Sequence, residues 1–187
     1  MKLKPLVAAL AACGMALSAS AYAAGDKNAY NAAKDRIDSE YKAEKDRCDS
    51  MSGNAKDVCE KQAKGKQKVA KAEAEASYKG TAKAQADARV ARADADHDVA
   101  KEKCDDMAGN AKDVCVKEAK VAHTKAKSEA RADRKGKEAR AEATQDTREA
   151  QYEAAREKCD SLSGDAKEKC QANAKARFGK RTTGTGS

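Results

Sequence analysis

The chain has 187 residues, enough for one ordinary domain, and charged residues make up 37% of it. Aromatic residues contribute only 3%, with no Trp and a single Phe, and alanine carries most of the remaining hydrophobic content. Because alanine buries little apolar area, this composition argues against a thick globular core and favours long, thin helices. Low hydropathy with high charge is also typical of disordered chains, so disorder is the rival prediction.

The first 23 residues have the pattern of a secretion signal. Lys2 and Lys4 precede a short apolar run over residues 5–17, and Ala-Tyr-Ala at 21–23 forms a small-x-small cleavage site. We therefore predict a signal peptide at 1–23 that is cleaved after Ala23. The apolar run is too short to span a bilayer comfortably, so we expect no stable membrane span in the mature chain.

A lipoprotein interpretation of the same segment stays open. Residues 10–13, Leu-Ala-Ala-Cys, look like a lipobox that would place a lipid anchor on Cys13, and an uncleaved anchor is a third alternative. Ordinary cleavage removes Cys13 and leaves six cysteines, an even number that suits disulfides. Since disulfides persist in the bacterial periplasm, we expect the mature protein to be periplasmic.

A twelve-residue motif bounded by two cysteines recurs three times, at 48–59, 104–115 and 159–170. The first two copies agree at ten of twelve positions, and the first cysteines of the copies lie 56 and then 55 residues apart. Glycines at 25, 80 and 136 precede those cysteines by 23, 24 and 23 residues. We therefore predict three helical hairpin repeats, followed by a flexible tail. Their boundaries are 24–79, 80–135 and 136–178, with the tail at 179–187.

Each motif is predicted to be a helix, a tight turn and a second helix. One residue type suits the left-handed position just past a helix end: Gly53, Gly109 and Gly164. The residue after each glycine suits the N-cap of the next helix: Asn54, Asn110 and Asp165. In one straight helix the two cysteines of a motif would lie about 16 Å apart, too far to bond, whereas a turn at the glycine brings them together.

The predicted disulfides are Cys48–Cys59, Cys104–Cys115 and Cys159–Cys170. Each closes a short loop and should stabilise its hairpin by about 3 kcal/mol on the chain-entropy account. Cross-pairing between hairpins, as in twin-cysteine helical-hairpin proteins, is the alternative.

The arms that lead into the turns show a weak seam at heptad spacing. Counting back from each first cysteine gives seam positions that include Ile37, Tyr41 and Met51, then Ala86, Ala93, His97 and Met107, then Ala141, Gln145, Tyr152 and Leu162. Many seam positions are small or polar, so we expect low stability away from the turns. Gly80 and Gly136 are either turns into the next hairpin or residues inside helices of about 50 residues, since one Gly costs only about 1 kcal/mol.

Charge is distributed unevenly between the arms. The segments 26–48 and 81–104 are neutral and 137–159 carries −1, the turns are acidic, and the following segments 60–79, 116–135 and 171–187 carry +3, +4 and +4. Basic arms could attract lipopolysaccharide, peptidoglycan-linked polymers, anionic lipid or nucleic acid. A solvated, salt-bridged helix surface is the alternative explanation.

The sequence offers no catalytic constellation, so we predict no enzyme activity and no cofactor or metal. His97 takes the seam position of Tyr41 and Tyr152 and is expected to pack, while His123 is expected to be exposed on a basic helix. Cysteines ten residues apart without a nearby His make a poor zinc site, and the acidic residues of the turns lack the alternating spacing of a calcium loop.

The signal and the repeated Cys-Asp-x-(Met/Leu)-x-Gly-(Asn/Asp)-Ala-Lys-(Asp/Glu)-x-Cys motif resemble a group of Ala/Lys-rich exported proteins of proteobacteria, which lends no assigned activity. Residues 71–76 and 139–143 are similar in texture to the helical arm of the Tol envelope system, and 81–88 is similar to late-embryogenesis-abundant proteins. Those stress proteins are poor in cysteine, unlike this chain.

These observations favour a non-enzymatic structural or interaction protein of the cell envelope, with an unidentified envelope protein as partner or with self-association. A binder of anionic envelope polymers or nucleic acid, and a stress protectant that stays unfolded until dried or crowded, are the alternatives.

Overall fold

The computed structural model describes residues 25–179, and this part of the chain is an all-helical structure built from hairpins. Its five helices are α1 (Lys27–Cys48), α2 (Gly53–Lys79), α3 (Ala82–Cys104), α4 (Gly109–Cys159) and α5 (Gly164–Phe178). The fold class predicted from the sequence is therefore confirmed. The predictions for the signal peptide, for Cys13 and for the tail beyond Gly179 lie outside the described residues.

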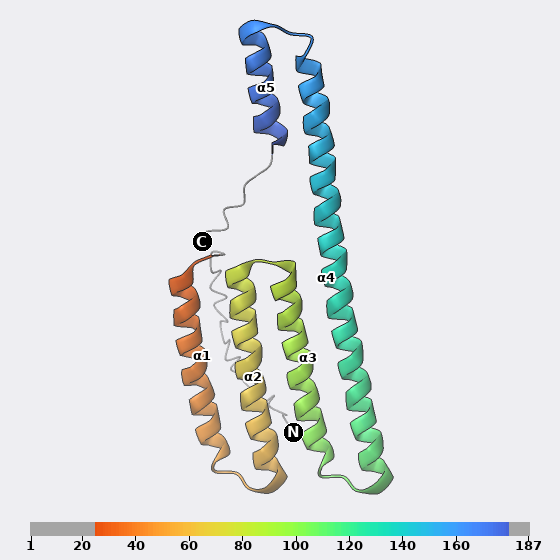
Figure 1. Ribbon diagram of the computed structural model, residues 1–187. Coiled ribbons are helices and arrows are strands. Elements are labelled where there is room, and N and C mark those ends of the chain that lie inside the picture. Colours follow the sequence, from red (N-terminus) through yellow and green to blue (C-terminus); the bar gives the residue numbers. More distant parts are fainter. Residues whose placement is uncertain (1–24, 180–187) are drawn as a thin grey trace, which may run out of the picture.

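The first four helices lie side by side in a row that is one layer thick (Figure 1). The helices run alternately up and down, and each one packs only against its neighbours in the chain. No other pair of the described helices approaches closely. None of them is both long enough and apolar enough to span a membrane.

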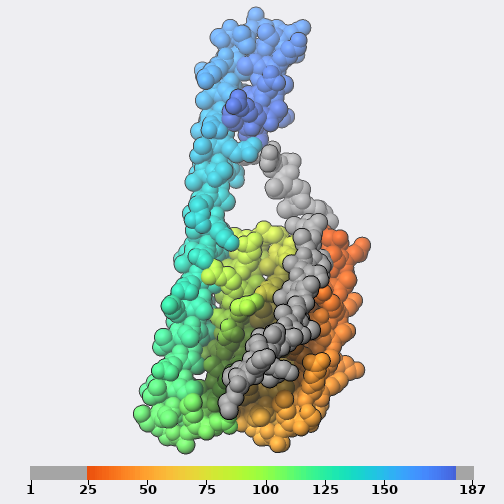
Figure 2. All heavy atoms as spheres, turned by 180° about the vertical axis from the view of Figure 1, so that it is seen from behind, coloured from red at the N-terminus to blue at the C-terminus, as the bar shows by residue number. Residues whose placement is uncertain are grey.

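Helix α4 is more than twice as long as α3 and extends far beyond the end of the row (Figure 1). Its 51 residues span roughly 75 Å at about 1.5 Å per residue. The far end of α4 pairs with the 15-residue α5, so the third hairpin stands clear of α1, α2 and α3 (Figure 2). The second and third repeats thus share one helix, with no break at the expected boundary between residues 135 and 136.

The two alternatives left open for Gly80 and Gly136 are both realised, one at each glycine. Gly80 ends α2 in the left-handed conformation with φ of 62°, and its N–H bonds to the Ala76 carbonyl. Thr81 follows and caps α3, because its hydroxyl accepts a hydrogen bond from Ala84 N at 3.1 Å. Gly136 is followed by Lys137, which cannot cap a helix in this way, and the helix continues through it.

Alanines and the cysteines form the thin core between the helices. Helix α3 lies between α2 and α4 and buries alanines on two sides. One set belongs to the predicted seam and includes Ala86, Ala93 and Cys104. The other set is Ala84, Ala88 and Ala95, which the heptad count missed. This second set packs toward α2, where Gly65 comes so close to Ala95 that an added Cβ would lie 3.0 Å from the Ala95 Cβ.

The predicted seam of the third repeat forms only near its turn. Tyr152 and Ala155 are half-buried and Cys159 is fully buried, but Ala141 and Gln145 are exposed. The reason is the length of α5, which ends at Phe178 after 15 residues, whereas α2 has 27. The seam upstream therefore has no second helix to pack against.

The two helical glycines make a matched pair for testing the close approach of α2 and α3. We expect Gly65→Val to lower the free energy of unfolding by about 1–3 kcal/mol, because the new side chain meets Ala95. Gly136→Val should change it by less than about 0.5 kcal/mol, because Gly136 faces only the flexible Arg140 side chain. Urea unfolding followed by circular dichroism measures both. Equal destabilisation by the two variants would contradict this packing.

Candidate functional site

The three disulfide-bonded turns share one construction. Each preceding helix ends at its first cysteine, and four residues then cross to the next helix. Disulfides join Cys48 to Cys59, Cys104 to Cys115 and Cys159 to Cys170, with Cα–Cα distances of 5.6, 5.8 and 5.7 Å. These are the predicted pairs, and the distances are typical of disulfides. In the first turn Met51 N donates a hydrogen bond to the Cys48 carbonyl at 2.9 Å, which closes the helix.

The glycines and capping residues of the turns differ in position from the prediction. Gly53, Gly109 and Gly164 do adopt left-handed φ values of 59°, 55° and 57°. They lie at the entry to the following helix, however, and not just past the end of the preceding one. Four residues are needed to cross between two helices held together by a disulfide, so the positive φ falls at the end of that crossing.

The N-cap prediction is wrong for the same reason. The N-cap positions are held by Ser52, Ala108 and Ser163, whose side chains make no capping hydrogen bond. The predicted caps lie inside the first helical turn: Asn54, Asn110 and Asp165. The Asn54 Nδ2 group is buried and has no hydrogen-bond partner in the described part of the chain. Asp165 in the first turn of α5 instead complements the positive end of the helix dipole.

An ion pair crosses each turn between residues seven apart. The Lys–Asp distances are 3.1 Å for Lys56–Asp49, 2.8 Å for Lys112–Asp105 and 2.8 Å for Lys167–Asp160. The hydrogen bond and the charge of the lysine hold the pKa values of the Asp105 and Asp160 carboxyls below their usual range. Sequence reasoning missed these pairs, although Asp and Lys occupy the same two motif positions in all three copies.

Each turn also exposes one large apolar side chain beside its disulfide. Met51 and Met107 are each 46% exposed and Leu162 is 42% exposed. The heptad count had placed all three in the seam, but the seam ends at the cysteine, because the four crossing residues leave the helix. The α1–α2 and α3–α4 turns lie at one end of the molecule and the α4–α5 turn at the other (Figure 1).

The two histidines meet between α3 and α4. The His97 and His123 rings stack with their centroids 4.5 Å apart, so His123 is half-buried and not exposed as predicted. His123 Nε2 lies 2.5 Å from Asp94 Oδ1, and Lys127 Nζ donates to the same oxygen at 3.1 Å. Burial raises the pKa of Asp94, but these two hydrogen bonds outweigh it and the pKa is lowered. Within residues 25–179 no three metal-ligating side chains gather.

The charges of α2 are largely matched by its two neighbours. Lys66 pairs with Glu44 at 2.7 Å and Lys71 with Asp38 at 2.5 Å, both on α1. Glu73 receives Arg92 of α3 at 2.6 Å. The basic arm expected at 60–79 therefore spends several of its charges inside the row.

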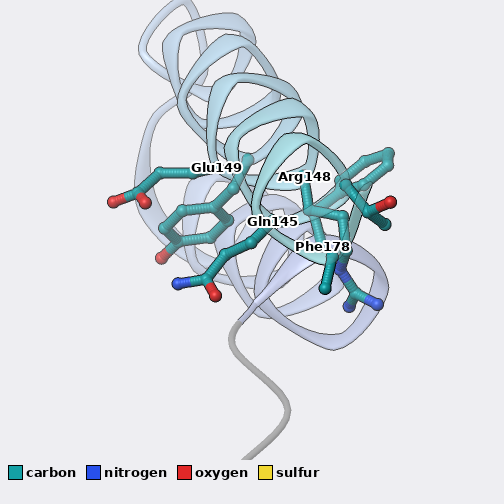
Figure 3. Close-up of a pocket in the computed structure, with 7 residues that line it drawn as sticks. Gln145, Arg148, Glu149 and Phe178 are labelled. Carbon is teal, nitrogen blue, oxygen red and sulfur yellow. The ribbon is translucent and has the colours of Figure 1, made fainter. Parts of the chain in front are cut away.

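A shallow pocket of about 400 Å³ lies where α5 ends against α4. Gln145, Arg148 and Glu149 project from neighbouring turns of α4, and Phe178 closes the pocket from the end of α5 (Figure 3). Arg148 donates a hydrogen bond to the Gly179 carbonyl at 3.2 Å. The pocket is the groove left where the short α5 stops, and its lining groups form no nucleophile–base pair.

Comparisons with known proteins add no relative, since no family model, no curated protein and no solved structure matches the chain.

Removing one disulfide should affect the third hairpin most. We expect Cys159→Ser/Cys170→Ser to lose about 3 kcal/mol of local stability, because α5 packs against α4 alone. Hydrogen exchange should then show α5 losing its protection. Cys48→Ser/Cys59→Ser is the matched control and should leave α2 protected, since α2 also packs against α3. Equal loss of protection in α2 and α5 would contradict this ranking.

Acid should weaken the turns through their lysine–aspartate pairs. The folded pKa values of Asp105 and Asp160 lie below 3.8, their ordinary value. Their stabilising contribution is therefore fully present above that value and is lost as the pH falls through the folded pKa. Thermal unfolding should show a smaller acid-induced drop in midpoint for Asp105→Asn/Asp160→Asn than for the unchanged protein. Asp106→Asn is the control, because Asp106 forms no ion pair within the described residues, and it should leave the drop unchanged.

Proposed function

We propose that the chain is a non-enzymatic structural or interaction protein of the bacterial cell envelope, exported to the periplasm by the signal-like segment at 1–23. Three disulfides support an oxidising compartment, because cytosolic reductants keep such thiols free. The resemblance to Ala/Lys-rich exported proteins, drawn from the repeated motif, points the same way.

The observation that carries the proposal is the placement of the turns. A row of helices one layer thick holds two disulfide-bonded turns at one end, and α4 carries the third to the opposite end (Figure 1). With α4 roughly 75 Å long, the molecule is suited to act as a spacer that presents turns at both ends. Each turn offers one exposed apolar side chain and a charged pair, which is the composition of a small protein-binding surface.

A second candidate function is the binding of anionic envelope polymers. It is favoured by three exposed lysines on the side of α4 that faces away from α3: Lys117, Lys120 and Lys125. The ion pairs of the described residues include none of them; α4 uses Lys112, Lys127 and Arg134 instead. Binding of this kind should weaken steeply with added salt. A stress protectant would differ from both candidates by giving little helical circular dichroism in dilute buffer.

The envelope-partner proposal predicts that capture depends on the turns. Cross-linking in living cells should join the unchanged protein to a defined envelope protein. The variant Met51→Gln/Met107→Gln/Leu162→Gln should lose this product, because it removes the apolar side chain from every turn. Ala172→Gln, at an exposed position on α5, is the control and should retain it. A product that survives the triple substitution would rule out the turns as the contact.

A further inference from the structure

Helix α4 has one side that nothing covers along its whole length. Helix α3 packs against its first half and α5 against its last part, both from the same side (Figure 1). Between them residues 137–147, eleven in succession, are exposed all round the helix. The outer face of α4 is the side opposite α3 and α5, and its exposed residues recur every three or four positions. They are Val114, Lys117, Val121, Thr124, Ser128, Arg131, Lys135, Ala139, Glu142, Asp146, Ala150 and Glu153.

Charge changes sign halfway along the outer face. Residues 117–135 contain seven bases and three acids, a net charge of +4. Residues 142–153 contain four acids and one base, a net charge of −3. A helix with this pattern is complementary to a second copy of itself laid alongside in the opposite direction.

The charges at the centre of the outer face are not satisfied within the chain. Arg131, Lys135, Glu142 and Asp146 are absent from the ion pairs of the described residues, which on this helix involve Lys127, Asp133 and Arg134 instead. Like charges also stand four residues apart, Arg131 before Lys135 and Glu142 before Asp146. That spacing destabilises a solitary helix, whereas a helix adapted to water carries opposite charges four apart.

We propose that two copies of the chain associate through the outer face of α4, antiparallel and about a twofold axis near Ala139. Lys135 then lies opposite Glu142 of the partner subunit, and Arg131 opposite Asp146 of the partner subunit. Symmetry makes each contact occur twice. The small side chains of Ala132 and Ala139 allow the two helices to approach closely. Because α3 and α5 lie on the other side of α4, the two rows of helices point away from each other.

The pairing does not depend on the envelope role, but it has a consequence for it. One copy presents two turns at one end and one turn at the other (Figure 1). An antiparallel dimer has three turns at each end, so both ends become equivalent binding surfaces.

Charge reversal tests the arrangement in the oxidised full-length protein. Sedimentation equilibrium over a micromolar concentration range should give twice the chain mass for the unchanged protein. Arg131→Glu/Lys135→Glu and Glu142→Lys/Asp146→Lys should each raise the dimer dissociation constant about tenfold or more, because several facing pairs become repulsive. The quadruple variant should return to within about threefold of the original value, since the charges face their opposites again.

Two further measurements separate this geometry from a general charge effect. An equimolar mixture of the two double variants should form a mixed dimer, because one is acidic along the outer face where the other is basic. Lys64→Glu/Lys68→Glu changes the net charge equally on exposed positions of α2 and should leave the dissociation constant unchanged. Circular dichroism confirms that each variant is folded, and the mixture and the quadruple variant keep the test decisive if one double variant is not.

Three results would overturn the proposal. They are a single-chain mass over the whole concentration range, a dimer indifferent to both double reversals, and a quadruple variant that stays dissociated. A chain that is monomeric alone but binds a polyanion in low salt would assign the outer face to an anionic polymer.

Discussion

The cysteine bridges supply what packing between these helices cannot. Alanine fills most helix-to-helix contacts, and the apolar area that it buries is too small to hold two helices firmly. Each disulfide holds two Cα atoms less than 6 Å apart at the end of a hairpin, where the chain has only four residues in which to reverse. The direction of every arm, the exposed side chains of the turns and the lysine–aspartate pairs across them all follow from that short crossing.

Three glycines show how context decides the outcome of one residue type. Gly80 precedes a threonine that can cap a helix, and the chain turns there. Gly136 is followed by lysine and stays helical. Gly65 is helical too, but its missing side chain lets α3 come close. The continuity of α4 through Gly136 sets the overall shape, because it sends the third turn to the opposite end of the molecule (Figure 1).

Electrostatics divides the molecule into a satisfied part and an unsatisfied part. Within the row, bases of α2 and acids of α1 and α3 pair across the helix contacts. Along the outer face of α4, charges are sorted by sign and repel their neighbours one turn away. The first arrangement stabilises a row within a single chain. The second has a physical explanation only if another surface lies opposite, and the antiparallel copy provides one with no change in either chain.

The sequence by itself determined the helical class, the repeats and the pairing of the cysteines. These depend on spacing within about a dozen residues, where the chain has few alternatives. The tertiary structure alone decided that Ala84, Ala88 and Ala95 form a second buried side of α3, that His123 stacks on His97, and that Met51 and its counterparts are exposed. Alanine occurs on every side of these helices, so a hydrophobic pattern cannot tell which side will meet a neighbour. That choice falls to contacts between residues distant in the chain, such as Gly65 with Ala95.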